Sequence, residues 1–213
     1  MDHVKAEGGR PKAEGKEESR YLIIPYAVVD GVASLRPSLL RDLFRRMQAD
    51  RLDRWIFHDG SVATAEDFVA LATSAGVHFF AVYDTAPDKR QFAALVFLTN
   101  YVGESALVHH CYFRDYWGEP AREIGRQVFD FLLGMQDAAG RMLYPVILGL
   151  TPANNRLGVR FAEAMGGRIA ATIPEMFWDA HAGRRVGAVL SYITREIAAE
   201  HRGRTAAPRK EAA

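Results

Sequence analysis

Two adjacent histidines, His109 and His110, stand in the apolar stretch SALVHHCYF. Imidazole titrates close to neutral pH, so either side chain could act as a general base, with Glu104 as a further candidate. Neighbouring strand residues point to opposite faces of a sheet, so only one of the pair can face a cleft. The other interpretation, an ordinary core histidine, stays open. His109 shares a face with Cys111, but no further ligand clusters with them, so the sequence predicts no metal site.

Two stretches combine aromatic and ionisable side chains in what we expect to be loops: RLDRWIFHDGSVAT (51–64) and PEMFWDAHAGRR (174–185). They are richer in aromatic residues than solvent-exposed connections need to be, which favours ligand contact. The alternative is that the tryptophans only cover the edges of the core. The residues predicted to bind a substrate are Trp55, His58, Asp59 and Trp178.

The elements that must position these residues follow from hydrophobic periodicity and from turn and capping residues. Apolar residues recurring at helical spacing predict four helices, at 37–50, 64–76, 119–140 and 154–167. β-Branched and aromatic runs predict seven strands, at 21–29, 77–84, 91–102, 105–113, 144–150, 168–177 and 185–195. Three antiparallel strands followed by a strand-helix-strand crossover indicate an α/β (α+β) fold, a mixed sheet with helices on both faces.

Composition limits the class of protein. The 213 residues are 49% hydrophobic, which suits one domain, expected at 20–197 between flexible tails at 1–19 and 198–213. A net charge of +1 gives no electrostatic reason to expect a nucleic-acid or membrane partner. The single cysteine fits a reducing compartment, and no signal-peptide core or membrane span is evident, so we expect a cytoplasmic protein.

The order of the elements and the stretch TPANNRLGVRFAEAMGG (151–167) together resemble the GNAT superfamily (Gcn5-related N-acetyltransferases) across residues 21–195. After their fifth strand, such proteins often carry an Asn, a small residue, an aromatic residue and a Gly-Phe pair. Asn155, Gly158, Phe161 and Gly166 stand in those places. The stretch is most similar to the version in some phage and prophage GNAT-like proteins.

The resemblance implies a binding site for acetyl-CoA, the acyl donor, where the fourth and fifth strands splay apart. Unpaired main-chain groups there can bind an extended ligand that contains amides, as pantetheine does. The helix that begins near Glu119 would direct its N-terminus at the pyrophosphate. The cofactor-binding residues implied are Cys111, Tyr112, Phe113, Arg114, Trp117, Gly118, Arg122, Asn154, Asn155 and Phe161.

The segment FRDYWGEPAREIGR (113–126) departs from the family pattern. GNAT proteins usually show Arg/Gln-x-x-Gly-x-Gly/Ala in this loop, whereas here Gly118 is the one glycine before the helix. The carboxylates of Asp115 and Glu119 would repel a pyrophosphate, and nearby arginines could restore positive charge: Arg114, Arg122 and Arg126.

A second departure concerns the proton donor to the leaving thiolate, commonly a tyrosine in this family. Ala162 stands at that position, so Tyr112, Tyr116 or Tyr144 would have to replace it. The predicted catalytic residues are His109, His110 and Tyr112.

Two functions are compatible with these patterns. The first is an acyl-CoA-dependent N-acetyltransferase in which an unidentified amine attacks the thioester between the fourth and fifth strands. The alternative is a GNAT-fold binding or assembly module that has lost the chemistry, as in a phage or prophage setting. The resemblance also implies a homodimer. An anion site at residues 114–122 favours the enzyme, whereas a loop closed by Trp117 and Pro120 favours the module.

Overall fold

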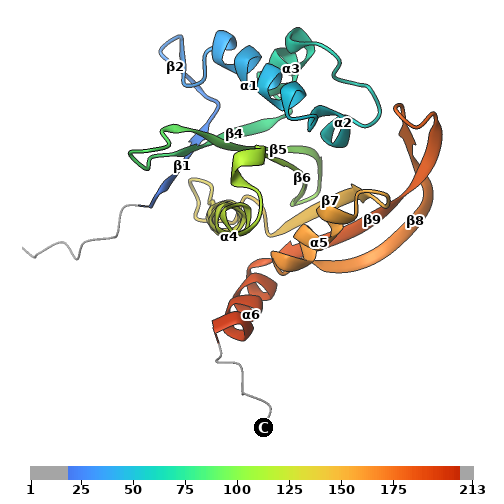
Figure 1. The fold of residues 1–213 in the computed structure, drawn as a ribbon. Coiled ribbons are helices and arrows are strands. Elements are labelled where there is room, and N and C mark those ends of the chain that lie inside the picture. Colours follow the sequence, from blue (N-terminus) through green and yellow to red (C-terminus); the bar gives the residue numbers. More distant parts are fainter. Residues whose placement is uncertain (1–18, 207–213) are drawn as a thin grey trace, which may run out of the picture.

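Seven strands form one mixed sheet in the computed structural model, which describes residues 19–206 (Figure 1). The order across the sheet is β1-β4-β5-β6-β7-β9-β8, and β6 and β7 pair in parallel while the other neighbours are antiparallel. The strands are β1 (Tyr21–Pro25), β4 (His78–Asp84), β5 (Gln91–Val102), β6 (Ser105–Tyr112), β7 (Val146–Pro152), β8 (Arg168–Asp179) and β9 (Arg184–Thr194). The predicted fold class is confirmed.

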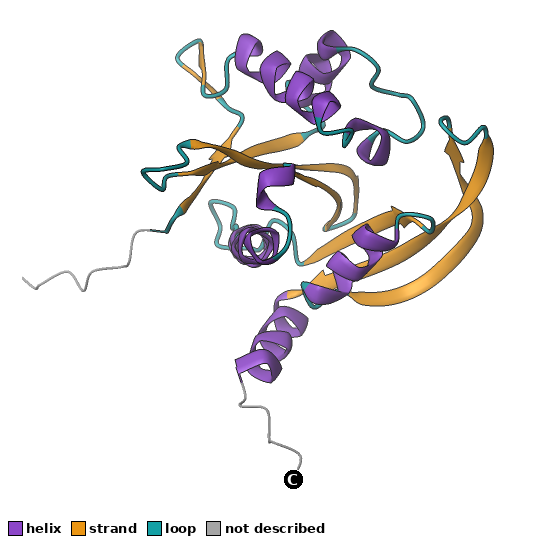
Figure 2. Cartoon of the chain, viewed as in Figure 1, coloured by secondary structure: helices purple, strands orange, loops and turns teal. Residues whose placement is uncertain are grey.

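Helices cover both faces of this sheet (Figure 2). In Figure 1, α1 and α3 lie on one side of β4 and β5, and α4 lies on the other. Helix α5 connects β7 to β8, as the predicted crossover requires. The helices are α1 (Pro37–Ala49), α2 (Asp53–Ile56), α3 (Ala65–Ala72), α4 (Glu119–Gly134), α5 (Arg156–Ala164) and α6 (Arg195–Ala206), with a 3₁₀ turn, η1 (Arg114–Tyr116).

An aromatic cluster joins α1 and α3 to the sheet. The ring of Phe44 stacks on Phe68 with centroids 5.2 Å apart, and Phe57 stacks on Phe97 of β5 at 6.1 Å. Phe68 also meets Phe79 of β4 edge to face at 5.7 Å. Such ring pairs contribute about 0.5–1.5 kcal/mol each beyond the area they bury. This cluster holds the segment between α2 and α3 against the sheet.

Two predictions at the N-terminal end need correction. The strand predicted at 21–29 ends at Pro25, one residue before the last main-chain hydrogen bond to β4, from Tyr26 to Phe79. The next residues form a separate hairpin of β2 (Val28–Val29) and β3 (Val32–Ala33), with positive φ at Asp30 and Gly31, as a tight primed turn requires. Residues 53–56, predicted as loop, form α2.

Two predictions in the C-terminal half were also wrong. Helix α4 ends at Gly134, not at Gly140, because Met135 turns to an extended conformation and Gly140 instead closes a turn at φ 78°. The flexible tail predicted from residue 198 begins inside α6, where Ile197 and Ala198 are buried. Residues 1–18 and 207–213 of the predicted tails lie outside the described residues.

None of the helices within residues 19–206 is long and apolar enough to cross a membrane.

Candidate functional site

The parallel pair of strands comes apart partway along its length. β6 and β7 are paired only from Ser105 to Leu107, opposite Val146 to Leu148. Beyond that point, residues 108–112 of β6 and 149–152 of β7 diverge, while their outer edges stay paired with β5 and β9. The splay predicted between these strands is therefore present, and it leaves main-chain edges that a strand-like ligand could pair with.

A cleft of about 590 Å³ opens beside the divergence. Its walls come from α2 and the loop after it, the ends of β5 and β6, the start of α5 and the end of β8. This volume suits a small-molecule ligand. The residues that line it are Trp55, Ile56, Phe57, His58, Asp59, Ser61, Val62, Leu71, Phe97, Thr99, Asn100, Leu107, Val108, His109, His110, Leu150, Thr151, Pro152, Asn155, Gly158, Met176, Phe177 and Trp178.

The adjacent histidines point to opposite faces of β6, as expected. The His109 ring lies flat on Phe97, with centroids 4.6 Å apart, and its Nε2 is 2.9 Å from the Thr99 hydroxyl. His110 lies 4.9 Å from the ring of Phe161 of α5, yet it also lines the cleft, so the expectation that only one of the pair faces it was wrong. Burial lowers the pKa of each histidine to about 4, so both are neutral at physiological pH. A base with so low a pKa is a weak proton acceptor.

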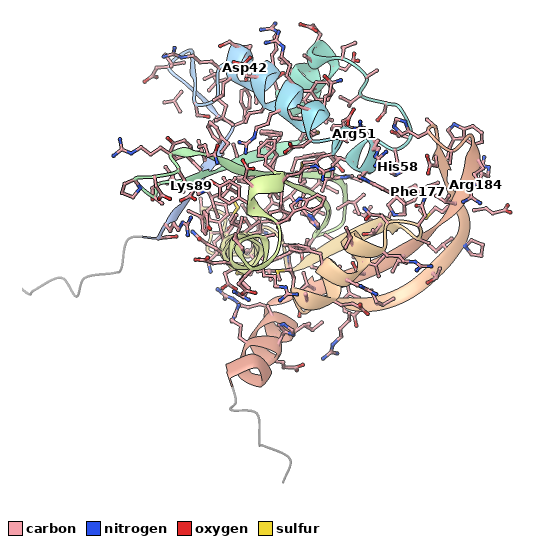
Figure 3. All side chains as sticks on the ribbon, viewed as in Figure 1. Asp42, Arg51, His58, Lys89, Phe177 and Arg184 are labelled. Carbon is pink, nitrogen blue, oxygen red and sulfur yellow. The ribbon has the colours of Figure 1, made fainter. Side chains whose placement is uncertain are left out.

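His58 has a different environment. Its Nδ1 lies 3.3 Å from the carbonyl oxygen of Trp178, and its own carbonyl accepts a 2.8 Å hydrogen bond from the Ala180 amide. A carbonyl can only accept, so Nδ1 carries the proton, and Nε2 of the neutral ring keeps its lone pair. The ring also contacts Phe177 at 4.4 Å. Figure 3 shows His58 and Phe177 lying close together, on the loop after α2 and near the end of β8.

The side chains predicted to contact a substrate are gathered at this end of the cleft. Trp55, His58, Asp59 and Trp178 all line it, although they come from segments more than a hundred residues apart. Oδ1 of Asp59 accepts from the amide and the hydroxyl of Ser61, at 3.0 and 2.7 Å. Burial acts to raise the pKa of Asp59, but these bonds and nearby His58 outweigh it, so the pKa lies below its ordinary value.

On the opposite side of the splay, α4 and α5 are in close contact. The rings of Tyr112 and Phe161 lie 4.8 Å apart, next to Gly125 of α4 and Met165. The Tyr112 hydroxyl is buried without a hydrogen-bond partner, and burial raises its pKa well above the ordinary value. A cavity of about 30 Å³, large enough for one water-sized group, lies between β7, Phe129 of α4 and Met165. The space between the two helices is therefore largely filled.

The loop before α4 holds its charges in local pairs. Glu119 bonds Arg126 at 3.1 Å and Arg122 at 3.3 Å. Arg114 donates through Nε to the carbonyl of Asp50 and lies over the ring of Trp117, 4.8 Å from its centroid. The predicted positive charges are thus near the helix N-terminus, but each already has a partner.

Two further residues shape this loop. Gly118 adopts φ 87°, a conformation that favours glycine, and it caps the N-terminus of α4. The Trp117 indole donates to the carbonyl of Tyr112 at 2.9 Å, and so occupies one main-chain acceptor at the end of β6.

The other predicted cofactor residues are dispersed. Cys111 and Phe113 are buried, Phe113 beneath the guanidinium of Arg46, and burial raises the pKa of the Cys111 thiol. The Asn154 amide donates to Asp179 at 3.0 Å. Asn155 caps α5 by accepting from the Gly158 amide at 3.0 Å, and it also lines the cleft. Two of these four residues are therefore core side chains.

The remaining proton-transfer candidates lie away from the cleft. Tyr116 is buried in η1 and donates to Asp84 at 3.1 Å, and burial raises its pKa to about 12. Tyr144 bonds His78. Glu104 is exposed in the turn before β6. In the part of the chain that the structure describes, no group of three or more His, Cys, Asp or Glu residues could hold a metal ion.

Several lining residues escaped the sequence analysis. Thr99 and Asn100 follow the apolar part of β5, and Met176 lies on an exposed strand, where nothing local marks it as part of a site. Gly125 did leave a signal, because a glycine in the middle of a helix usually has a packing or functional reason. Here the reason is close contact with α5.

A mixed seven-stranded sheet whose parallel pair diverges beside the N-terminus of a helix has the fold of the GNAT acetyltransferases. The chain is similar to a GNAT-family acetyltransferase of Bacillus anthracis, with a TM-score of 0.63 and 15% identity, over 84% of this chain and 96% of that one. It is also similar to the spermidine N-acetyltransferase of Vibrio cholerae, solved with CoA and spermine (TM-score 0.62, 16% identity, 84% and 98% covered). A dodecameric structure of the Vibrio enzyme gives a TM-score of 0.59 at 15% identity, with 83% and 95% covered.

Neither a scan against protein-family models nor a search of curated proteins found a match. The likeness is one of fold, at low sequence identity.

Proposed function

We propose that the protein is an acyl-CoA-dependent N-acyltransferase that transfers an acetyl group to an amine. The observation that carries this proposal is the end of the β6–β7 ladder after Leu107 and Leu148, beside the cleft of about 590 Å³. Free strand edges next to a ligand-sized cleft suit an amide-containing donor on one side and an acceptor on the other. Solved structures of the same fold include N-acetyltransferases, which agrees with the proposal.

Two features of the chain fit a coenzyme A thioester. The unpaired hydroxyl of Tyr112 is a buried donor in the splay, and it remains protonated because burial raises its pKa. The N-terminus of α4, capped by Gly118, favours a phosphate by its dipole and free amides. Phe161 lies across the space between α4 and α5, and in our proposal this ring rotates when the donor binds.

The thioester supplies the acyl group. The amine nitrogen forms an amide bond with the carbonyl carbon, and the C–S bond breaks. The amine loses one proton, and the leaving sulfur gains one. In this proposal His58 accepts the proton, since Trp178 fixes its tautomer and leaves Nε2 as the basic nitrogen. Tyr112 donates a hydrogen bond to the leaving sulfur, in place of the tyrosine replaced by Ala162, and the proton that sulfur gains comes from solvent. His109 and His110 shape the cleft, because their lowered pKa values make them poorer bases.

Thermal-shift and calorimetric titrations with acetyl-CoA and with free coenzyme A test the proposal. A ligand that binds the native state raises the apparent stability by mass action, and we expect a clear shift at sub-millimolar ligand. Arg114→Glu and Gly118→Asp should abolish it, whereas Lys89→Glu should not. Lys89 is exposed on the turn between β4 and β5, far from His58 (Figure 3). Circular dichroism of each variant must show that the fold is retained.

A second function, a binding module without cofactor chemistry, is favoured by one observation. Phe161 and Met165 fill the space beside Gly125, where a donor would pass between α4 and α5. Absence of any shift with either ligand, in wild type and in Phe161→Ala, would support the module and contradict the enzyme.

A further inference from the structure

The outer end of the cleft is an aromatic enclosure built from two elements. Trp55 of α2 and Phe57 after it form one wall, and Met176, Phe177 and Trp178 of β8 form the other. Trp178 is 50% exposed and Met176 is 42% exposed, so the wall on β8 offers apolar surface that the fold itself does not bury. Such surface at a cleft rim marks a place where a ligand supplies the missing contacts.

The two walls are held at a fixed separation. The carbonyl of His58 accepts from the Ala180 amide at 2.8 Å, and His58 Nδ1 donates to the carbonyl of Trp178 at 3.3 Å. The His58 ring also packs on Phe177. Because the loop after α2 is tied to the end of β8 through both main chain and side chain, the enclosure is formed before a ligand arrives.

The charge of the enclosure comes from one group. Among the described residues that line the cleft, Asp59 is the single carboxylate, and no lysine or arginine is present. Both hydrogen bonds from Ser61 go to Oδ1, which leaves Oδ2 for another donor. None of the ion pairs between described side chains includes Asp59. A cationic ligand would therefore meet one carboxylate that no lysine or arginine of the cleft lining pairs with.

The surroundings disfavour a second positive charge. The guanidinium of Arg54 lies over Trp55, 5.3 Å from the ring centroid, so this indole is already next to a cation. A further ammonium in the cleft would lie against apolar side chains without a counter-charge, and burying an unpaired charge is costly.

We propose that the acyl acceptor is a primary monoamine with an apolar or aromatic body, whose ammonium is bound by Asp59 and whose body lies between Trp55 and Trp178. This inference rests on the proposed acyltransferase function and narrows its substrate class. A polyamine is a poor fit, because its additional ammonium groups find no further carboxylate in the described part of the cleft.

Calorimetric titration of the full chain with matched small molecules tests this without acyl-CoA. The probes are 2-phenylethylamine, its uncharged analogue 2-phenylethanol, and spermidine. We expect 2-phenylethylamine to bind about tenfold more tightly than either of the others, as the gain or loss of one charge-assisted hydrogen bond to the exposed carboxylate of Asp59 implies. Equal or tighter binding of spermidine would overturn the proposal.

Three variants, titrated in the same way, test whether 2-phenylethylamine binds in this enclosure. Asp59→Asn keeps an acceptor for Ser61 but removes the charge, and it should weaken 2-phenylethylamine by about ten- to hundredfold. Trp178→Ala should weaken it by removing one wall, and Asp88→Asn, on an exposed turn, should leave it unchanged. An affinity unaffected by Asp59→Asn would contradict the assignment.

An acyl-transfer assay with acetyl-CoA and the same amines, run beside these titrations, separates the two proposals. Acyl transfer to spermidine but not to 2-phenylethylamine would preserve the acyltransferase and refute the monoamine. Asp59-dependent binding of 2-phenylethylamine by a protein that binds neither acetyl-CoA nor coenzyme A would support the ligand class and refute the acyltransferase.

Discussion

Gly125 is the point of closest approach between α4 and α5, and replacing it by alanine perturbs this contact directly. A Cβ at Gly125 would lie 2.6 Å from Sδ of Met165, 2.7 Å from Cζ of Phe161 and 3.3 Å from the hydroxyl oxygen of Tyr112. Carbon atoms in contact normally stay at about 3.5–4.0 Å. Gly125→Ala therefore forces the side chains of α5 to move or the two helices to separate.

The expected change in stability is a difference between two effects. Overpacking a core costs about 1–3 kcal/mol. Replacing glycine by alanine inside a helix stabilises the helix by about 1 kcal/mol. Because the overlap at Gly125 involves two side chains at once, we expect Gly125→Ala to lower the free energy of unfolding by about 1–2 kcal/mol.

A double-mutant cycle with Phe161 tests whether this contact is the cause. Phe161→Ala removes a partly buried ring and should cost about 2–3 kcal/mol. In the double variant, the methyl group introduced by Gly125→Ala occupies part of the space that the Phe161 ring leaves. The double variant should therefore be about 1 kcal/mol more stable than the sum of the two single-variant losses predicts. Gly134→Ala on the same helix is the matched control, since a Cβ at Gly134 would meet no atom within 4 Å.

Urea unfolding followed by circular dichroism gives these free energies from the midpoint and slope. A Gly125→Ala variant as stable as wild type, with additive effects in the cycle, would refute the described contact between α4 and α5. In parallel, Phe161→Ala should bind acetyl-CoA several-fold more tightly if the ring lies in the path of the donor. Unchanged affinity would show that the donor does not pass this point.

Two further predictions concern ionisable groups. Hydrogen bonds from Arg20, at 2.9 and 2.8 Å, hold the pKa of buried Asp84 below its ordinary value, so the pair stabilises the fold above the unfolded pKa of about 3.9. This contribution is lost as the pH falls through the lower folded pKa, so Asp84→Asn should cost about 2 kcal/mol near neutral pH and progressively less as the pH falls below the unfolded value, measured by urea unfolding against pH. His58→Gln keeps a donor for the carbonyl of Trp178 but removes the base, so kcat/KM should fall by about 10²–10⁴ while thermal stability is retained. An unchanged kcat/KM would assign the base to another residue.

Much of the fold was predictable because it depends on local patterns. Leu40, Phe44 and Met47 of α1 recur at helical spacing, and Thr64 and Asp67 form a capping box at the start of α3, both local patterns of the kind that predict a helix. Errors occurred where a non-local contact overrides a local tendency. α6 is helical because Ile197 and Ala198 pack against the domain, although the segment itself is polar.

The site was predictable only in part. Both stretches with excess aromatic residues line the cleft, although Trp55 lies in α2 and Phe177 and Trp178 lie in β8, and not in loops as predicted. The sequence could not distinguish the three histidines. Their roles depend on burial, which lowers the pKa of His109 and His110 to about 4, and on the carbonyl of Trp178, which fixes the tautomer of His58.

The sequence by itself determined the order of the seven sheet strands and of α1, α3, α4 and α5, the opposite orientation of His109 and His110, and the aromatic character of the stretches around Trp55 and Trp178. Each of these depends on residues a few positions apart. The tertiary structure alone decided where β6 leaves β7, that Phe161 meets Gly125, and that Asp59 is left without a counter-charge in the described cleft. Those features depend on distances between segments far apart in the chain, which only packing of the whole domain sets.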